Sequence, residues 1–455
     1  MRDALDRAQT PRVAPPPTVE LPPIIRHTLA NGLGVLVVEK HDLPVVDVVL
    51  VTRAGGYADP PALAGRAALA ADLLDEGTAS RSALEIAETA DQLGASLYSR
   101  ATWDEIAVGL HVLAPRLEPA LALLIDVALR PAFTADEIER KRKERLAAIV
   151  QEQDEPRILA SQGFARAVYG GEHPFGAPLG GTARSVQALD RDAFAGFYAG
   201  RQRPGNGFLV VVGEVRTDAV LTALEDALAG WQDEPVPPDA SLPAPVRVPR
   251  IHLLDRPGAP QSEIRVGHEG AARGTPDYFP MLVLNTILGG AFTSRLNSRL
   301  REEKGFTYGA GSAFAFRRHG GPFVASSAVF TGATAEAIGI VLHEMRRIRD
   351  ERVTASELER ARSYLALGLP RRFETTGDVA RLVIEQELYG LGADFYTTFV
   401  ERVRAVSAQQ VQEAAERRLD PDHATVVVAG DRTAIEPDLR ALDAGDVVVM
   451  TSPSD

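Results

Sequence analysis

The segment FTADEIER, at residues 133–140, recurs as VTASELER at residues 353–360. A second segment, RPGNGFLVVVGEV at residues 203–215, recurs as DPDHATVVVAGD at residues 420–431. Both pairs keep the same order at a spacing of about 220 residues, which indicates an internal duplication. The 455-residue chain is therefore expected to fold as two similar halves and not around one core.

Each half is predicted to have an α+β fold, a mostly antiparallel sheet with helices packed on one face, because its strands and helices do not alternate strictly. An Asn-Gly turn signal at residues 31–32 lies between the first two predicted strands, and the Val-rich GFLVVVG closes the first half. The capping box Ser-Ala-Leu-Glu predicts a helix start at Ser82, and Gly94 is a suitable C-terminal cap. The helices predicted in this half include 65–76, 82–94, 117–129 and 135–153.

A proline-rich stretch without periodicity, WQDEPVPPDASLPAPVRVPR, separates the two halves and is typical of an interdomain linker. The expected segments are a Pro-rich N-terminal extension (1–24), a first domain (25–231), the linker (232–249), a second domain (250–440) and a tail (441–455).

Composition excludes several classes of protein. The net charge of −13 argues against nucleic-acid binding, and the lack of cysteine removes disulfides, thiol catalysis and Cys-based zinc sites. No uncharged apolar run is long enough for a transmembrane segment, and the N-terminus lacks the apolar core of a signal peptide. The sequence as given predicts a soluble cytoplasmic protein, or a periplasmic one if a signal has been removed, and leaves the compartment open.

The least generic stretch is LGGAFTSRLNSRLREEKGFTYGAGSAF, at residues 288–314. Gly289-Gly290 is expected to end an apolar helix, residues 294–303 to form another, and Tyr308 to lie at the start of a strand. Taken alone, this pattern is equally typical of an ordinary helix–turn–strand joint with solvated arginines.

The stretch resembles the corresponding segment of the pitrilysin/insulysin family of zinc metallopeptidases, in the short branch that includes mitochondrial processing peptidase. The Arg and Tyr of that family, seven residues apart, match Arg301 and Tyr308. YGGEHPFGAPLGGT (169–182) is similar to the family's His-Pro-Tyr-Gly loop, and the turn at 204–206 also matches, so the resemblance covers about residues 25–435. It implies that the Arg/Tyr pair binds substrate, since a Tyr hydroxyl can donate to an oxyanion and an Arg can hold a peptide carbonyl.

The resemblance also shows what this chain lacks. The family binds zinc through His-x-x-Glu-His on its first long helix, and a distant Glu is the third protein ligand. Flanking Gly and Gly-Thr residues place that motif on GRAALAADLLDEGT (65–78), where its three positions are Ala68, Ala71 and Asp72. No shift of the alignment restores it, because no histidine lies between His41 and His111, and the former third ligand falls on Gln151 or Glu152.

Other motifs carry less weight. ASLYSRATWDEIAV (95–108) resembles the edge strand on which the family lays its substrate, although an ordinary sheet strand fits equally well. His343-Glu344 has Arg347 where a second ligand would stand, and KRKER (141–145) is expected to be a solvated helical face.

The sequence therefore predicts a non-catalytic subunit of a heterodimeric zinc metalloendopeptidase. This chain binds no cofactor in that interpretation: a homologous zinc-bearing subunit carries the metal, and Arg301 and Tyr308 contribute the substrate- and oxyanion-binding pair for peptide or unfolded polypeptide substrates. The alternative is a non-enzymatic scaffold or peptide-binding protein, for which a homodimer is one option. A third interpretation is a lone enzyme with unrelated chemistry.

Overall fold

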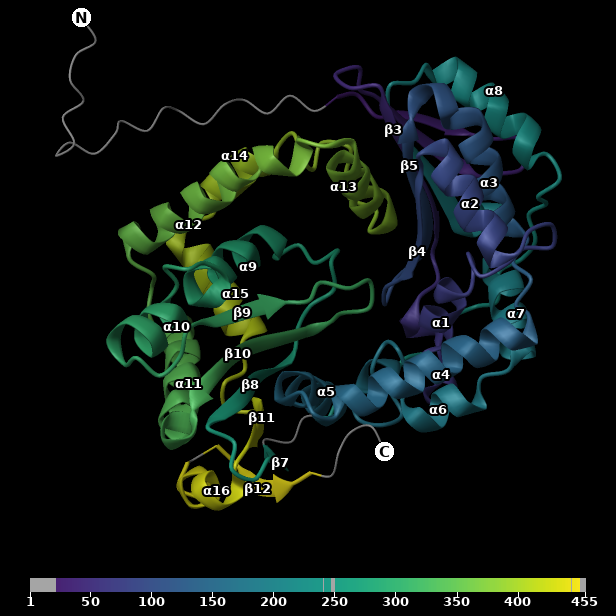
Figure 1. Ribbon diagram of the computed structural model, residues 1–455. Helices are drawn as coiled ribbons and strands as arrows, with labels where there is room; N and C mark the ends of the chain where they lie inside the picture. The colour runs from purple at the N-terminus through teal and green to yellow at the C-terminus, as the bar shows by residue number, and fades with distance from the viewer. Residues whose placement is uncertain (1–21, 240, 247–249, 443, 451–455) are drawn as a thin grey trace, which may run out of the picture.

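The computed structural model of the chain describes residues 22–239, 241–246, 250–442 and 444–450. These residues form two six-stranded sheets, one in each half, with helices packed around them (Figure 1). The α+β class and the two-half plan are thus confirmed. The predicted N-terminal extension lies outside the described residues except for 22–24, as do positions 240 and 247–249 of the predicted linker.

The first sheet has the order β1-β2-β6-β3-β5-β4, which leaves β4 at an edge. The β2–β6 pair is parallel and the other pairs are antiparallel. Its strands are β1 (Ile25–Thr28), β2 (Gly34–Glu39), β3 (Val45–Thr52), β4 (Ser96–Ala101), β5 (Ile106–Leu113) and β6 (Gly207–Gly213).

The second sheet repeats this order as β12-β7-β11-β8-β10-β9. The duplicated Val-rich segments become β6 and β11, each third from one edge, so the sequence repeat is also a repeat of topology. The strands are β7 (Arg250–Asp255), β8 (Gln261–Glu269), β9 (Ala310–Phe314), β10 (Pro322–Phe330), β11 (Thr425–Gly430) and β12 (Asp446–Val449). The last of these lies in the segment predicted as a tail, where its apolar residues pair in parallel with β7.

The helices of the first half largely follow the prediction. Ser82 and Glu85 form the predicted capping box, and Gly94 ends that helix with φ 62°. The helix over 65–76 is shorter than predicted and ends at Asp72, because the next two leucines turn into the core. The helices are α1 (Arg66–Asp72), α2 (Ala83–Leu93), α3 (Leu117–Leu129), α4 (Ala135–Glu152), α5 (Pro156–Tyr169), α6 (Ala183–Ala188), α7 (Arg191–Arg201) and α8 (Thr217–Leu228).

The second half adds helices and two π-helical turns. The turns, Thr286–Gly290 and Ser298–Glu303, lie on either side of the short helix α10 (Arg295–Asn297). The other helices are α9 (Tyr278–Asn285), α11 (Thr334–Asp350), α12 (Ala355–Gly368), α13 (Thr376–Leu388), α14 (Phe399–Ala405), α15 (Ala408–Arg418) and α16 (Arg432–Arg440). No helix among the described residues is long and apolar enough to cross a membrane.

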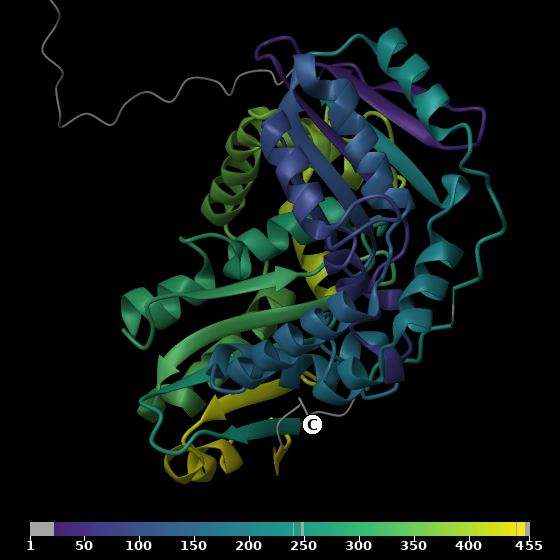
Figure 2. The same ribbon diagram turned by 45° about the vertical axis from the view of Figure 1, so that its right-hand side comes forward.

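The two halves exchange one helix each. Helix α5 of the first half packs on β11 and β8 of the second sheet, and α13 of the second half packs on β6 and β3 of the first. Figure 1 shows α13 beside the first sheet, and in Figure 2 the blue helix α5 lies across strands of the second. Each sheet therefore carries its own helices on one face, as predicted, and a helix of the opposite half on the other.

The exchanged helices bury apolar surface across the junction. Val383 and Ile384 of α13 belong to one buried cluster with Val49 and Phe208 of the first sheet. Phe164 of α5 belongs to another, together with strand residues of the second sheet. Because such burial is worth about 25 cal/mol per Å² of apolar surface, these contacts hold the two halves together.

We expect Ile384→Ala to lower the free energy of unfolding by about 2–4 kcal/mol, because it opens a cavity between α13 and the first sheet. The matched control is Leu367→Ala on α12, whose side chain is 44% exposed and should cost far less. Urea denaturation monitored by circular dichroism measures both. Equal losses in the two variants would show that the α13 contact does not stabilise the fold.

Candidate functional site

Helix α1, where the family motif would lie, is held firmly in place. The Asp59 carboxylate accepts hydrogen bonds from the Ala67 N–H at 3.0 Å and from Arg66 Nε at 3.2 Å, which fixes the start of the helix. At its end, Ser99 Oγ of β4 donates to the Ala71 carbonyl at 2.7 Å. The helix is thus a rigid part of the first half, packed against the edge strand.

The three motif positions offer little to a metal. Ala71 is fully buried, Ala68 is half-buried, and both have methyl side chains that cannot bind a metal. Asp72 lies at the surface, yet the protein around its carboxyl raises the pKa by desolvation, an effect that Lys141 and Arg145 oppose. One carboxylate without imidazoles does not fit zinc.

Basic side chains of α4 lie beside these positions. Lys141 Nζ lies 2.6 Å and Arg140 Nη2 2.5 Å from the two carboxylate oxygens of Glu76, which follows α1. The prediction that 141–145 is a solvated face is wrong for Lys141 and Arg145, whose side chains are 22% and 18% exposed. Fixed cations here disfavour a second positive charge, such as a metal ion.

Neither candidate for the former third ligand is available. Gln151 is neutral and exposed. Glu152 is engaged by Arg145, with Nη1–Oε1 at 2.5 Å and Nη2–Oε2 at 3.1 Å, and it accepts a hydrogen bond from Gln162. In the described parts of the chain, no three His, Cys, Asp or Glu side chains are grouped so that they could hold a metal ion.

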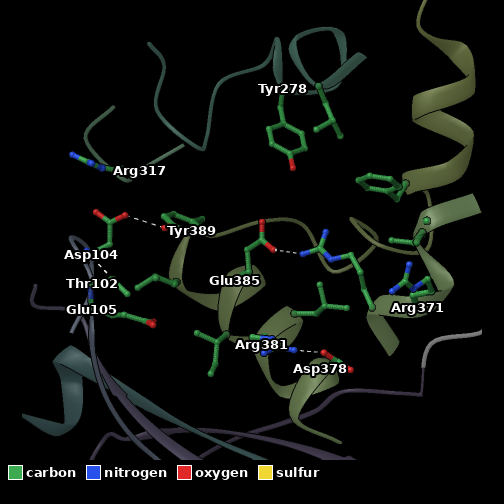
Figure 3. Close-up of a pocket in the computed structure, with 18 of the residues that line it drawn as sticks. Thr102, Asp104, Glu105, Tyr278, Arg317, Arg371, Asp378, Arg381, Glu385 and Tyr389 are labelled. Atoms are coloured by element: carbon green, nitrogen blue, oxygen red, sulfur yellow. Dashed lines mark hydrogen bonds and ion pairs between the residues drawn. The ribbon is translucent and has the colours of Figure 1, made fainter. Parts of the chain in front are cut away.

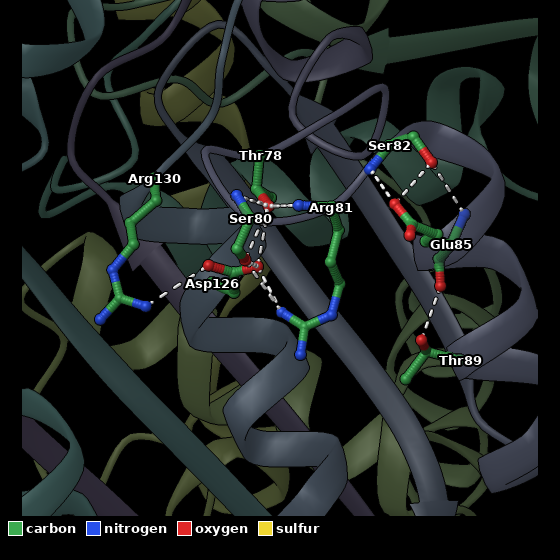
Figure 4. A network of polar contacts seen from close by, with 8 residues as sticks. All are labelled: Thr78, Ser80, Arg81, Ser82, Glu85, Thr89, Asp126 and Arg130. Carbon is green, nitrogen blue, oxygen red and sulfur yellow. Dashed lines mark hydrogen bonds and ion pairs between the residues drawn. The ribbon is translucent and has the colours of Figure 1, made fainter.

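The loop that follows α1 is fixed by a buried carboxylate (Figure 4). Asp126 of α3, 2% exposed, accepts from Thr78 Oγ1 at 2.8 Å, Ser80 Oγ at 2.8 Å and Arg81 Nη1 at 2.5 Å. Burial raises the pKa of Asp126, but these hydrogen bonds outweigh it and keep the pKa below the ordinary value. The loop that follows α1 is therefore held firmly against α3.

The Arg301/Tyr308 segment has the opposite character, since it places polar side chains at the surface. The Arg301 guanidinium lies over the Phe292 ring at 4.4 Å and its Nε is 3.5 Å from Glu302. Tyr308 is 93% exposed, and its hydroxyl has no hydrogen-bond partner in the described part of the chain. Tyr308 and Phe292 line a groove of about 530 Å³ beside β9.

Sequence reasoning missed the residues that hold this groove in shape. Asn297, 3% exposed, donates from Nδ2 to the Phe292 carbonyl at 2.6 Å and accepts the Ala310 N–H at 3.2 Å. Thr307 Oγ1 accepts the Gly309 N–H at 3.0 Å and donates to the Gly309 carbonyl at 2.9 Å. Through Asn297, these bonds connect Phe292, whose ring lies under the Arg301 guanidinium, to the strand that follows Tyr308. The only sequence signal was an asparagine inside the predicted helix 294–303, where this residue type is unfavourable.

The other predicted peptide site, residues 95–108, contains β4, which is an edge strand as its position in the first sheet shows. The strand packs against α1 and pairs with β5. Peptide binding at this edge remains a prediction. His343 is exposed on α11, and Glu344 beside it is fully buried among arginines, so the pair is no metal site.

Comparison with known proteins agrees with this fold. Residues 35–177 match the family described as insulinase (peptidase family M16), and residues 188–365 match the peptidase M16 inactive domain. The chain belongs to this family, the pitrilysin/insulysin type. The inactive-domain match begins near the end of the first half and covers much of the second.

Curated relatives and solved structures extend over nearly the whole chain. An uncharacterized zinc protease of Mycobacterium tuberculosis is 26% identical over 423 residues, 92% of this chain and 96% of its own. A second, from Mycobacterium leprae, is 26% identical and covers 89% of this chain and 91% of its own. A crystal structure described as the peptidase M16 inactive domain from Pseudomonas fluorescens superposes with a TM-score of 0.83 at 26% identity, covering 90% and 98%. A Helicobacter pylori protease shares the fold, with a TM-score of 0.82 at 18% identity, covering 90% and 100%.

Restoring two imidazoles should not restore a zinc site. We expect the double variant Ala68→His/Asp72→His to hold far less than one zinc per chain after gel filtration, because no third ligand is free and Lys141 and Arg145 face the position. Inductively coupled plasma mass spectrometry measures the zinc content, and the parent chain is the control. One tightly held zinc per chain would contradict this reasoning.

A second prediction concerns the bracing of Tyr308. Asn297→Ala should remove the bond to the Ala310 N–H and speed amide hydrogen exchange around residues 308–311 by about 5- to 30-fold, as loss of about 1–2 kcal/mol implies. Hydrogen-exchange mass spectrometry on the isolated chain measures this. Exchange in the second-sheet core, at β11, serves as the internal control and should not change; unchanged exchange at 308–311 would show that Asn297 does not brace the loop.

Proposed function

We propose that this chain is the non-catalytic subunit of a heterodimeric zinc metalloendopeptidase. The observation that carries the proposal is a contrast within one chain. The positions predicted for the zinc motif are Ala68, Ala71 and Asp72, whereas Tyr308 is 93% exposed and its hydroxyl has no hydrogen-bond partner among the described residues. An exposed hydroxyl that no described residue engages is suited to a substrate held against another subunit.

In this proposal the zinc-bearing homologue supplies the metal and the general base, and this chain contributes two side chains that contact the substrate. Tyr308 donates its hydroxyl hydrogen to the oxyanion that forms as the peptide carbonyl is attacked. Arg301 keeps its positive charge at any working pH, and its planar guanidinium, supported by the Phe292 ring, binds the substrate carbonyl beside it. The groove of about 530 Å³ holds the flanking part of the peptide.

The relatives support the peptidase part of the proposal, since several are named zinc proteases. The inactive-domain match and the missing His-x-x-Glu-His motif support the non-catalytic part. A second candidate function is a non-enzymatic scaffold or peptide-binding protein, acting as a homodimer. It is favoured by a cavity of about 950 Å³ that residues of both halves line (Figure 3), which no partner chain is needed to form.

The test uses the chain assembled with a homologue that carries the zinc motif. Tyr308→Phe should lower kcat about 100- to 1,000-fold with little change in assembly, the usual effect of losing one oxyanion donor. Arg301→Ala should lower kcat/KM, whereas Lys143→Ala, on the exposed face of α4, should leave both unchanged. Peptide hydrolysis and analytical ultracentrifugation give the two readouts.

The outcomes separate the interpretations. Parental activity in both Tyr308→Phe and Arg301→Ala complexes would refute the contribution of this pair. A chain that forms only homodimers, and gives no activity with any motif-bearing homologue, would favour the scaffold. Peptide cleavage by the isolated chain in the presence of a chelator would instead indicate a lone enzyme with unrelated chemistry.

A further inference from the structure

Three polar side chains of the first sheet form a row across neighbouring strands. Ser96 of β4 is paired with His111 of β5, and His111 is paired in turn with Asp47 of β3 (Figure 1). Residues that oppose each other on adjacent strands share one face of the sheet, and their Cβ atoms lie about 4.5–5.5 Å apart. A serine, a histidine and an aspartate therefore lie side by side in that order, on the face opposite the one where Ser99 of β4 contacts α1.

The histidine is oriented by the aspartate. His111 Nδ1 lies 3.0 Å from Asp47 Oδ2, and since an ionised carboxylate only accepts, Nδ1 is the nitrogen that carries the hydrogen. Nε2 of the neutral ring then keeps its lone pair, which no described residue engages. Asp47 is 8% exposed, and α13 begins against it: a Cβ added at Gly377 would lie 3.6 Å from Asp47 Oδ1. The aspartate is therefore enclosed between the sheet and the exchanged helix.

The serine is accessible and unengaged. Ser96 is exposed, and its hydroxyl makes no hydrogen bond within the described part of the chain. The imidazole beside it is 47% exposed, so small molecules can reach both groups. By contrast, the Ser99 hydroxyl of the same strand donates to the Ala71 carbonyl on the other face. A serine next to a histidine that an aspartate orients is the arrangement in which a hydroxyl becomes a nucleophile.

Apolar side chains flank this row on the same face. Alternate residues of a strand share a face, so Tyr98 of β4 and Leu113 of β5 lie on the same side as Ser96 and His111. The Tyr98 ring crosses over Gly109, where an added Cβ would lie 2.4 Å from its hydroxyl. Tyr98 is 38% and Leu113 50% exposed. The two side chains therefore offer apolar surface to a substrate whose reacting group lies at the serine.

We propose that Ser96, His111 and Asp47 form a hydrolytic site for carboxylic esters with an apolar acyl chain. Ser96 Oγ attacks the ester carbonyl as its hydrogen passes to His111 Nε2, and the alcohol leaves with that hydrogen as the ester C–O bond breaks. Water then attacks the acyl-serine, His111 takes one hydrogen from it and returns a hydrogen to Ser96 Oγ, and the carboxylic acid is released. Asp47 is the positioning residue, because it acts only through the His111 ring.

This site goes beyond the proposed function and does not rest on it. Its chemistry uses no metal, no partner subunit and no peptide. It lies on the first half of the chain, whereas Arg301 and Tyr308 lie on the second. The two reactions can therefore be measured independently of each other.

The test uses the isolated full chain and an alkyl fluorophosphonate that carries biotin. Attack by Ser96 Oγ forms an O–P bond and breaks the P–F bond, so that fluoride leaves and His111 takes the hydroxyl hydrogen. We expect the label on Ser96, located by peptide mass spectrometry, and hydrolysis of para-nitrophenyl butyrate that persists in a chelator. Ser96→Ala should remove this label and lower the hydrolysis rate at least about 10-fold. The control Ser356→Ala, at an exposed serine of α12, should change neither.

A second His–Asp pair in the chain provides the control for the histidine. His423 Nδ1 also lies 3.0 Å from an aspartate, Asp420, in a turn of the second half. His111→Gln should slow the labelling of Ser96 about 100-fold or more, as the loss of a general base implies, and His423→Gln should leave it unchanged. Circular dichroism shows whether each variant is folded, and the exposed position of His111 makes its variant informative if one at Asp47 does not fold.

Asp47 is tested by two substitutions. Asp47→Asn should slow labelling at least about 10-fold, because an asparagine can hold the other tautomer of His111. Asp47→Glu should recover part of the rate, because a carboxylate again faces Nδ1. A role in packing alone would give the opposite order, since glutamate is the larger change in volume.

Three results would overturn the inference: no label on Ser96, equal labelling of Ser96 in folded His111→Gln and His423→Gln, or hydrolysis by Ser96→Ala at the parental rate. Failure here is distinguishable from failure of the proposed function. A chain without a label on Ser96, whose complex with a zinc-bearing homologue loses peptidase activity through Tyr308→Phe, would retain the proposed function and reject the ester site.

Discussion

The packing of α5 and α13 on each other's sheets is the contact on which the rest of the structure depends. Each helix covers a sheet face that the opposite half leaves bare, so neither half can bury its apolar residues alone. The equivalent positions of the two helices in the sequence repeat make the exchange reciprocal. It fixes the relative orientation of the sheets, and so forms the cavity at their junction and sets the distance between α1 and the Tyr308 groove.

Within that frame, the two predicted sites differ in character. In the first half, α1 is fixed by Asp59, packed on β4 and followed by a loop held on Asp126. The positions predicted for the zinc motif carry no imidazole, and basic side chains of α4 lie beside them. In the second half, Tyr308 is exposed on a loop that Asn297 braces. Under the proposed function, a homologue would supply the metal that the motif positions of this chain do not hold.

The sequence predicted the duplication, the α+β class, the individual strands around β6 and β11, and the capped helix α2, because each depends on local patterns: a repeat, a turn signal, a capping box. It misjudged the end of α1 and the solvation of Lys141 and Arg145, because both depend on what packs against them. It also gave no sign of the brace at Asn297, which depends on how Phe292 and Ala310 fold against that side chain.

By itself, the sequence determined that no zinc motif exists here, since absent imidazoles cannot be supplied by folding, and that an Arg and a Tyr stand seven residues apart where the family has its pair. Only the tertiary structure decided that Tyr308 is exposed, that Glu152 is paired with Arg145, and that loop 102–105 and Arg317 line one cavity. The physical reason is that residue identity fixes which bonds are chemically possible, whereas burial and long-range packing fix which of them are made.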